Sequence, residues 1–170
     1  RRQRQMCIRD STVTINQPIE KVAQAYSTRE YWEFIAEKLS PEPGELHEFA
    51  DNTATLFEIL PKSILPEAAQ AMVSQDLKLK RVVTVGELDG DTAKHTMTGD
   101  VKGTPVDLGA EYTATRDGDN TKLDYELEAK VNIPFMGAAL EPKVADALEE
   151  IVENEAKLTC LLYTSDAADE

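Results

Sequence analysis

The stretch from Thr121 to Leu158 constrains the fold more than any other part of the chain. Its first half alternates apolar and polar residues, which is the period of a strand with one buried face. The apolar members are Leu123, Tyr125, Leu127, Ala129, Val131 and Ile133. After a Pro-Phe-Met-Gly corner, apolar residues recur at steps typical of one side of a helix; they are Leu140, Val144, Leu148, Ile151 and Leu158. Full burial of each contributes about 1.5–3 kcal/mol, so we expect the helix to lie against the apolar face of the sheet.

The chain before this stretch predicts two short helices and then more sheet. Thr12–Asn16 alternates like a strand, Pro18 begins an amphipathic helix, and Thr28 is placed to cap a second helix. From Glu45 onward, apolar and polar residues alternate with the period of strands, beginning with a hairpin that turns at Asp51-Asn52. The later strands are separated by turns rich in Gly and Asp. The prediction is an α+β domain in which a curved antiparallel sheet of six to seven strands wraps around a long C-terminal helix, with two short helices after the first strand.

Both ends of the chain match translated sequencing-adaptor DNA. Residues 1–10, RRQRQMCIRD, correspond to a transposase adaptor whose last bases begin the codon of Ser11, and residues 160–170 correspond to its reverse complement. Segments of such origin are set aside before a fold is inferred. We therefore expect a single domain at 12–159, with 1–11 and 160–170 non-native and with few core contacts from residues 1–10.

The charge and the cysteine count exclude several classes of function. The formal net charge is −14, and the domain carries all of it because the two ends contribute +3 (four Arg, one Asp) and −3 (two Asp, one Glu). An acidic surface repels phosphate backbones and anionic lipid head groups, which disfavours nucleic-acid partners and electrostatic membrane binding. Both cysteines, Cys7 and Cys160, lie in the adaptor segments, so disulfides, thiolate metal sites and a cysteine nucleophile are not expected.

The remaining composition predicts no cofactor and no stable membrane insertion. With two histidines, a tetrahedral zinc site would need carboxylates, and these show no recognisable spacing. No apolar run approaches the length that spans a bilayer, and no signal peptide is visible. The expected location is the cytoplasm.

Three segments carry a resemblance to a known family. They are ILPEAA at 64–69, KGTPVDLGAEY at 102–112, and KVNIPFMGAALE at 130–141 followed by Glu155. Together with the order of the elements, they are similar to the bacterial family DUF2505, of the START-like or helix-grip superfamily, and the resemblance covers essentially all of 12–159. It implies a cavity between the curved sheet and the long helix, suited to a lipid or another hydrophobic small molecule. Its motifs are structural, and it carries over no ligand and no catalytic residue.

The side chains expected to face that cavity are the candidate ligand-binding residues. They mix small side chains with aromatic and polar-tipped ones, as ligand pockets do, although the same mixture also fits a filled core. The candidates are Trp32, Phe57, Met72, His95, Met97, Leu108, Tyr112, Tyr125, Leu127, Met136, Val144 and Leu148. The segment Pro61–Gln75 and the corner Phe135-Met136 are expected to form movable rims.

Three classes of function remain open. The preferred one is a carrier or sensor of a hydrophobic small molecule or lipid, without a cofactor and with the oligomeric state undetermined. The second is an enzyme of the cyclase or dehydratase type, for which His95 with Tyr112 or Tyr125 is the available set. A lone inward histidine is, however, more often a hydrogen-bonded core residue than a catalytic one. The third is an interaction module of the chaperone-activator kind, which predicts a filled interior and an exposed apolar patch of several hundred Å².

Overall fold

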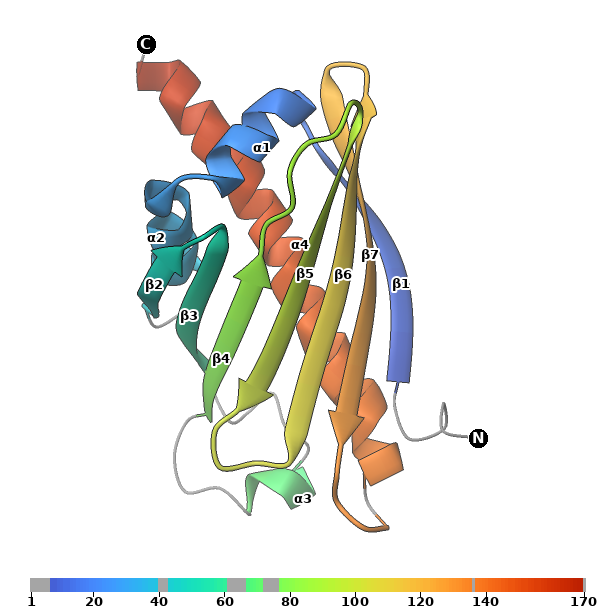
Figure 1. Ribbon diagram of the computed structural model, residues 1–170. Helices are drawn as coiled ribbons and strands as arrows, with labels where there is room; N and C mark the ends of the chain where they lie inside the picture. Colours follow the sequence, from blue (N-terminus) through green and yellow to red (C-terminus); the bar gives the residue numbers. More distant parts are fainter. Residues whose placement is uncertain (1–6, 40–42, 61–66, 72–76, 136, 170) are drawn as a thin grey trace.

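The computed structural model describes residues 7–39, 43–60, 67–71, 77–135 and 137–169. The elements in chain order are β1 (Cys7–Ile15), α1 (Ile19–Tyr26), α2 (Arg29–Lys38), β2 (Glu45–Ala50), β3 (Thr53–Leu60), α3 (Glu67–Gln70), β4 (Leu77–Thr84), β5 (Thr92–Val101), β6 (Val106–Asp117), β7 (Asn120–Val131) and α4 (Gly137–Asp169). Figure 1 shows the sheet curving beside the long helix α4. The α+β architecture predicted from the sequence is confirmed.

The described strands form one antiparallel sheet in the order β1-β7-β6-β5-β4-β3-β2. From β2 to β7 each strand pairs with the next along the chain, and β1 pairs with β7. Tight turns make this possible. Asp51 and Asn52 both take positive φ between β2 and β3, and Gly103 and Gly118 do so at the next hairpin turns along β5, β6 and β7.

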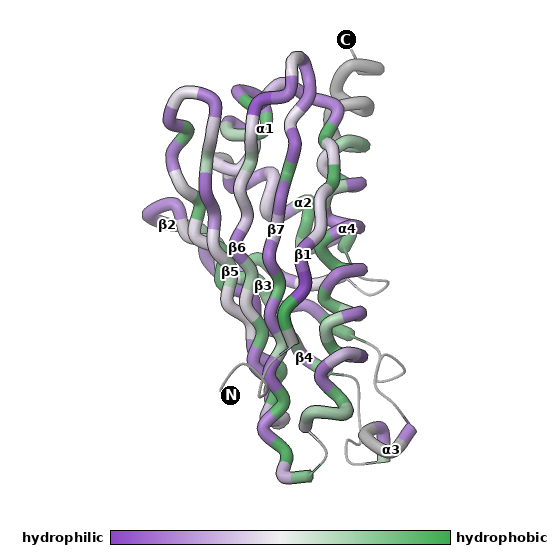
Figure 2. The backbone as a smooth tube through the Cα atoms, turned by 90° about the vertical axis from the view of Figure 1, so that its right-hand side faces the viewer, coloured by the Kyte–Doolittle hydropathy of each residue, from purple (hydrophilic) through white to green (hydrophobic). Residues whose placement is uncertain are grey.

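The sheet buries one face beneath the helices. Alternate residues of β7 are buried from Thr121 to Val131, as the period of the sequence predicts. α4 crosses this face and packs on β7 and β1, whereas α2 packs on β2, β3 and α4. The side view in Figure 2 shows α4 running along that face of the sheet. The interior therefore lies between the sheet, α2 and α4.

The buried side of α4 differs in detail from the predicted stripe. Its buried apolar residues are Leu140, Ala145, Leu148, Val152 and Ala156, and its buried polar ones are Glu141, Glu155 and Thr159. The predicted Val144, Ile151 and Leu158 are only partly buried against the core. The apolar residues of α4 occupy the centre and both flanks of its buried side, so their spacing alone did not locate the centre of that side.

Buried Glu141 fixes the junction between β7 and α4. Its Oε2 accepts a hydrogen bond of 3.0 Å from the backbone N–H of Val131. The N–H of Gly137 donates to the carbonyl of Ile133 at 2.8 Å. A Cβ at Gly137 would lie 2.2 Å from the Val131 carbonyl oxygen, so this close approach requires glycine. The motif that carried the family resemblance thus has a structural role at this corner.

The strand at one end and the helix at the other continue past the expected domain boundaries. β1 begins at Cys7, earlier than the predicted Thr12, and pairs with β7 along its whole length; α4 continues to Asp169. Residues 8–10 are not among the residues of the hydrophobic core, whereas Cys160 on α4 packs against it. Ile8 is exposed, and Arg9 pairs with Asp146 on the surface. The adaptor origin of both ends stays a prediction.

The short helix α3 lies within the segment Pro61–Gln75, of which the structure describes residues 67–71. Figures 1 and 2 place it at the end of the sheet where α4 begins. Among the helices that the structure describes, none combines the length and the apolar character needed to cross a bilayer.

Candidate ligand-binding site

A cluster of three buried charges lies where β3, β4 and α4 meet. The fully buried Arg81 donates from Nε and Nη2 to Glu58 Oε1, at 3.1 and 2.9 Å. Its Nη1 lies 2.7 Å from Glu155 Oε2. Glu58 and Glu155 are also buried. We call Glu58, Arg81 and Glu155 the buried triad.

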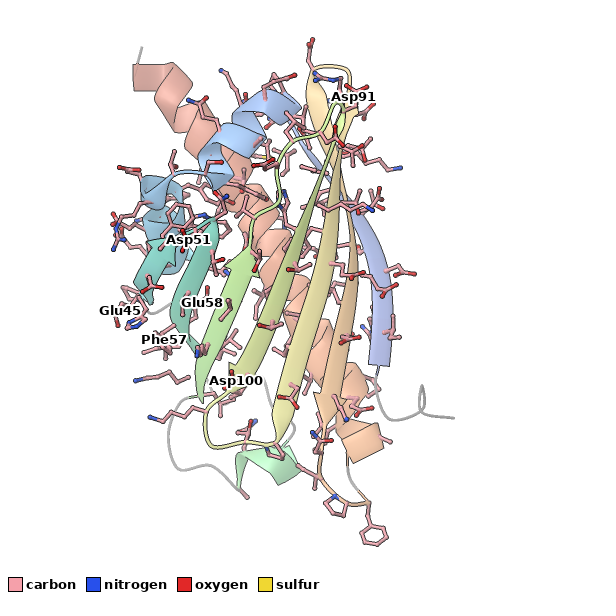
Figure 3. The ribbon with its side chains drawn as sticks, viewed as in Figure 1. Glu45, Asp51, Phe57, Glu58, Asp91 and Asp100 are labelled. Carbon is pink, nitrogen blue, oxygen red and sulfur yellow. The ribbon has the colours of Figure 1, made fainter. Side chains whose placement is uncertain are left out.

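The alternation of the strands places the buried triad inside the molecule. Glu58 stands in the buried phase of β3 and Arg81 in that of β4. In the register of the two strands, Arg81 is opposite Leu56 and Glu58 is opposite Leu79, so the two charged residues are diagonal neighbours, within reach of long side chains. Figure 3 labels Glu58 on β3. Glu155 reaches the pair from the buried side of α4.

The environment of the buried triad changes how its groups ionise. Burial raises the pKa of Glu58. The positive charge of Arg81 offsets only part of this rise, and the negative charge of Glu155 adds to it. Burial opposes the charge of Arg81, yet the carboxylates of Glu58 and Glu155 raise its pKa above its ordinary value. With both glutamates ionised, the buried triad has a net charge of −1, and Arg81 stays a cation throughout.

Two buried oxygen atoms beside the buried triad have no partner among the described residues, Glu58 Oε2 and the Tyr112 hydroxyl. Arg81 Nη1 and Glu155 Oε2 face each other at 2.7 Å as an ion pair that lacks the geometry of a hydrogen bond. Burial raises the pKa of Tyr112. Tyr112 also lies close enough to the buried triad to sense its charges, because Glu155 raises this pKa further and Arg81 lowers it. The Tyr112 hydroxyl therefore keeps its proton. Because buried polar atoms are nearly always paired, the two unpartnered oxygen atoms mark places where a bound molecule is able to hydrogen-bond.

The helices α1 and α2 supply an aromatic wall beside the buried triad. The ring of Tyr26 lies 5.0 Å from those of Tyr31 and His95. The indole N–H of Trp32 donates to the Tyr26 carbonyl at 2.9 Å. The Tyr31 hydroxyl is 2.8 Å from the Thr159 hydroxyl, which in turn donates to the backbone carbonyl of Glu155 at 2.9 Å. This chain of hydrogen bonds ties α2 to α4 at the position of the buried triad.

His95 is a buried and neutral residue of this wall. Its Nδ1 accepts a hydrogen bond of 3.0 Å from the backbone N–H of Gly86, which joins the segment after β4 to β5. Burial lowers the pKa of His95 to about 4. It lies directly opposite Tyr112 in the β5–β6 register, so the structure brings together two members of the predicted catalytic set. A histidine with this pKa and with Nδ1 already engaged is a poor proton donor at neutral pH.

Most of the candidate ligand-binding residues come together in the interior. The buried ones, from the sheet, α2 and α4, are Trp32, His95, Met97, Leu108, Tyr112, Tyr125, Leu127 and Leu148. Val144 is partly buried at the edge. Met72 and Met136 lie outside the described residues, as does much of the predicted rim at 61–75.

Phe57 does not belong to this interior. It alternates with the buried Glu58 along β3, and neighbouring residues of a strand point to opposite faces. Its ring packs against that of His47, with centroids 5.4 Å apart. Figure 3 labels both Phe57 and Glu58 on this strand. Phe57 therefore lies on the outer face of the sheet.

Sequence reasoning missed the buried triad although a signal was present. Glu58 and Arg81 are the charged members of alternating series that are otherwise apolar, with Leu56 and Leu60 in β3 and Leu79 and Val83 in β4. A charge in the apolar phase of a strand indicates either the end of the strand or a buried polar site. Two such charges on neighbouring strands favour the second interpretation.

Two hollows on the outside of the described chain differ from this interior in their lining. One, of about 310 Å³, lies between α1 and residues 85–88. Another, of about 400 Å³, lies over β1, β6 and β7 and is lined largely by acidic and hydroxyl side chains. Within the described ranges, no three His, Cys, Asp or Glu side chains are grouped so that they could hold a metal ion.

Solved structures with this architecture come from several bacteria. TTHA0849 of Thermus thermophilus has 11% identity and a TM-score of 0.62, over 92% of this chain and 99% of that one. The Zhui aromatase/cyclase of Streptomyces sp. R1128 has 14% identity and a TM-score of 0.55, over 97% and 96%. A START superfamily protein of Mycobacterium smegmatis has 13% identity and a TM-score of 0.54, over 91% and 98%. Identities this low show a shared fold.

The sequence itself matches a family over nearly its whole length. Residues 10–161 fit the family described as protein of unknown function (DUF2505). A search among curated proteins gives no match. The helix-grip architecture and this match together show that the chain belongs to the DUF2505 family, with the fold of the START superfamily.

Proposed function

We propose that this protein binds a hydrophobic small molecule, such as a lipid, between the sheet and α4, and acts as its carrier or sensor in the cytoplasm. The observation that carries the proposal is the pair of buried, unpartnered oxygen atoms of Glu58 and Tyr112 in an interior formed mainly by apolar side chains. Ligand sites combine apolar walls with a few polar groups that fix the orientation of the ligand. Here the walls are the inner face of the sheet and the buried side of α4.

Stability alone does not account for the buried triad. Removing charges from water costs several kcal/mol per ion, so a buried ion pair is weak evidence for stability. Well-packed apolar residues in the same place often give a protein that is equally stable or more stable. An unpartnered carboxylate oxygen adds about 1–3 kcal/mol of cost. A binding role accounts for this cost, because a ligand that hydrogen-bonds to Glu58 Oε2 or to Tyr112 offsets part of it.

The shared fold supports the same proposal. One of the structural neighbours is an aromatase/cyclase, an enzyme whose reaction requires that an organic molecule be held against the protein. The same architecture is thus compatible with a site for an organic compound, and in the present chain the polar groups of the interior gather at the buried triad.

A cyclase-type enzyme is the second candidate, and the raised pKa of Glu58 favours it. A buried carboxyl group with a raised pKa beside a protonated tyrosine is a possible general acid. Conversion of a bound compound to a product of different mass or absorbance, lost in Glu58→Gln, distinguishes an enzyme from a carrier. An interaction module is less well supported, because the exposed large apolar residues of the described chain, Ile8, Phe135 and Leu161, lie on three separate segments.

Binding of the uncharged fluorophore Nile red, with displacement by lipids and other hydrophobic compounds, tests the proposed function. The matched variants are Ala110→Phe and Glu111→Phe, neighbours on β6 of which the first is buried and the second exposed. We expect a saturable fluorescence increase that Ala110→Phe weakens at least tenfold and Glu111→Phe leaves unchanged. Thermal unfolding of both variants is the control that they are folded. Absence of saturable binding to the wild type, or equal binding by both variants, would contradict the proposal.

A further inference from the structure

We propose that the ligand presents an uncharged or cationic hydrogen-bond donor, a hydroxyl or an amine, to the buried triad, and that the site discriminates against carboxylates. This inference rests on the proposed function. It concerns the chemical class of the ligand, which neither the family nor the fold specifies.

The first step is that Arg81, the buried cation of the described residues, is already paired with two carboxylates. Its Nε and Nη2 donate to Glu58 and its Nη1 lies against Glu155. An incoming carboxylate would have to compete with two fixed carboxylates for one guanidinium. Both competitors are held by the protein, one on β3 and one on α4, and lose no translational entropy on pairing.

The second step concerns the sign of the local charge. Two glutamates surround one arginine, so with all three groups ionised a third carboxylate would change the net charge from −1 to −2 in a site screened from water. Protonation of Glu58, whose pKa burial raises, would make the buried triad neutral but would still leave Arg81 without excess positive charge. Unpaired anions are costly at buried sites, whereas an ammonium or a hydroxyl is not repelled.

The third step is the match between the unpartnered atoms and the ligand. An ionised Glu58 Oε2 only accepts hydrogen bonds, whereas the Tyr112 hydroxyl both donates and accepts. A ligand hydroxyl satisfies either atom, because it too donates and accepts. An amine donates to Glu58, and a carboxylate only accepts, which leaves Glu58 Oε2 unpaired.

Three compounds that share one alkyl chain separate these head groups: dodecanol, dodecylamine and dodecanoic acid. Their affinities for the intact protein are measured at pH 7 by displacement of Nile red and by calorimetry. We expect the alcohol and the amine to bind at least tenfold more tightly than the acid, which corresponds to about 1.4 kcal/mol. This ranking needs no variant and does not depend on how a substitution affects folding.

Variants identify the group responsible. Glu58→Gln removes one negative charge from the buried triad, and we expect it to reduce the preference for the alcohol over the acid about tenfold. Tyr112→Phe removes the second unpartnered oxygen, and we expect weaker binding of the alcohol. The matched control is Glu141→Gln, which removes a buried carboxyl group of α4 that accepts a hydrogen bond from the N–H of Val131 at the β7–α4 junction. Glu141 lies about 21 Å from Glu155 along α4, so we expect this variant to leave the ranking unchanged.

The outcomes separate this inference from the proposed function. Tighter binding of dodecanoic acid than of the other two, or equal shifts in Glu58→Gln and Glu141→Gln, would overturn the inference while binding itself stands. Nile red binding that none of the three compounds displaces would also overturn it. Failure of the wild type to bind Nile red at all would instead refute the proposed function.

Discussion

Replacing His95 with asparagine should remove a defined part of the pH dependence of stability. Asparagine keeps an acceptor in place of Nδ1 for the N–H of Gly86, but it does not titrate. Burial lowers the pKa of His95 from 6.5 to about 4, so protonation in the folded state is disfavoured by about 2.5 pH units, or about 3 kcal/mol. Because the folded pKa is depressed, this contribution to stability is complete above pH 6.5 and is lost progressively as the pH falls towards 4.

Urea unfolding of the wild type and of His95→Asn, measured at intervals from pH 7 to pH 4, tests this expectation. Carboxylates titrate in the same range in both proteins, so the informative quantity is the difference between the two free energies of unfolding. We expect this difference to shift by about 3 kcal/mol against the wild type between pH 7 and pH 4. Parallel curves would show that His95 is protonated as easily in the folded state as in the unfolded one, and would refute the description of a buried neutral imidazole.

Three further substitutions test the interior and its supports by urea unfolding at neutral pH. Arg81→Met leaves two buried carboxylates without a cation and should cost about 3–5 kcal/mol, part of which is recovered as the pH falls and they protonate; a loss below about 1 kcal/mol would place Arg81 in solvent. Gly137→Ala puts a Cβ where the Val131 carbonyl now lies and should cost about 1–3 kcal/mol, whereas an unchanged stability would contradict this close approach. Thr159→Val removes the hydroxyl that lies 2.8 Å from the Tyr31 hydroxyl and should cost about 1–3 kcal/mol; no loss would mean that another group satisfies the Tyr31 hydroxyl.

The architecture could be predicted because its determinants are local in the sequence. The alternation through β7 and the turns at Asp51-Asn52 and Gly118 specify a meander of strands. The apolar stripe of α4 predicts that this helix packs against the buried face of the sheet. The predicted helix starts also hold: Thr28 caps α2 by accepting a hydrogen bond from the N–H of Tyr31. These features depend on neighbours within a few residues, where propensity and periodicity are most informative.

The candidate site was predicted less completely because it depends on long-range partners. In β3, apolar residues occupy both phases, with Leu56 and Leu60 in one and Phe57 and Ile59 in the other. Hydropathy alone therefore does not show which of the two alternating sets of β3 is buried. The charge of Glu58 favours burial of Phe57 and Ile59, whereas the structure buries the set that contains Glu58. Only Arg81, more than twenty residues later, makes the burial of Glu58 possible. The same dependence on a distant partner hid Glu155 within an acidic helix.

The central claim is that the interior at the buried triad holds a hydrophobic compound, and native mass spectrometry of the protein purified from cells tests it most directly. Denaturation then releases any bound compound for identification. We predict a reproducible added mass that belongs to a hydrophobic molecule with a hydroxyl or amine group, and that is absent from Ala110→Phe and present in Glu111→Phe. A protein that leaves the cell bare, and that stays bare after incubation with a broad panel of hydrophobic compounds, would contradict the claim.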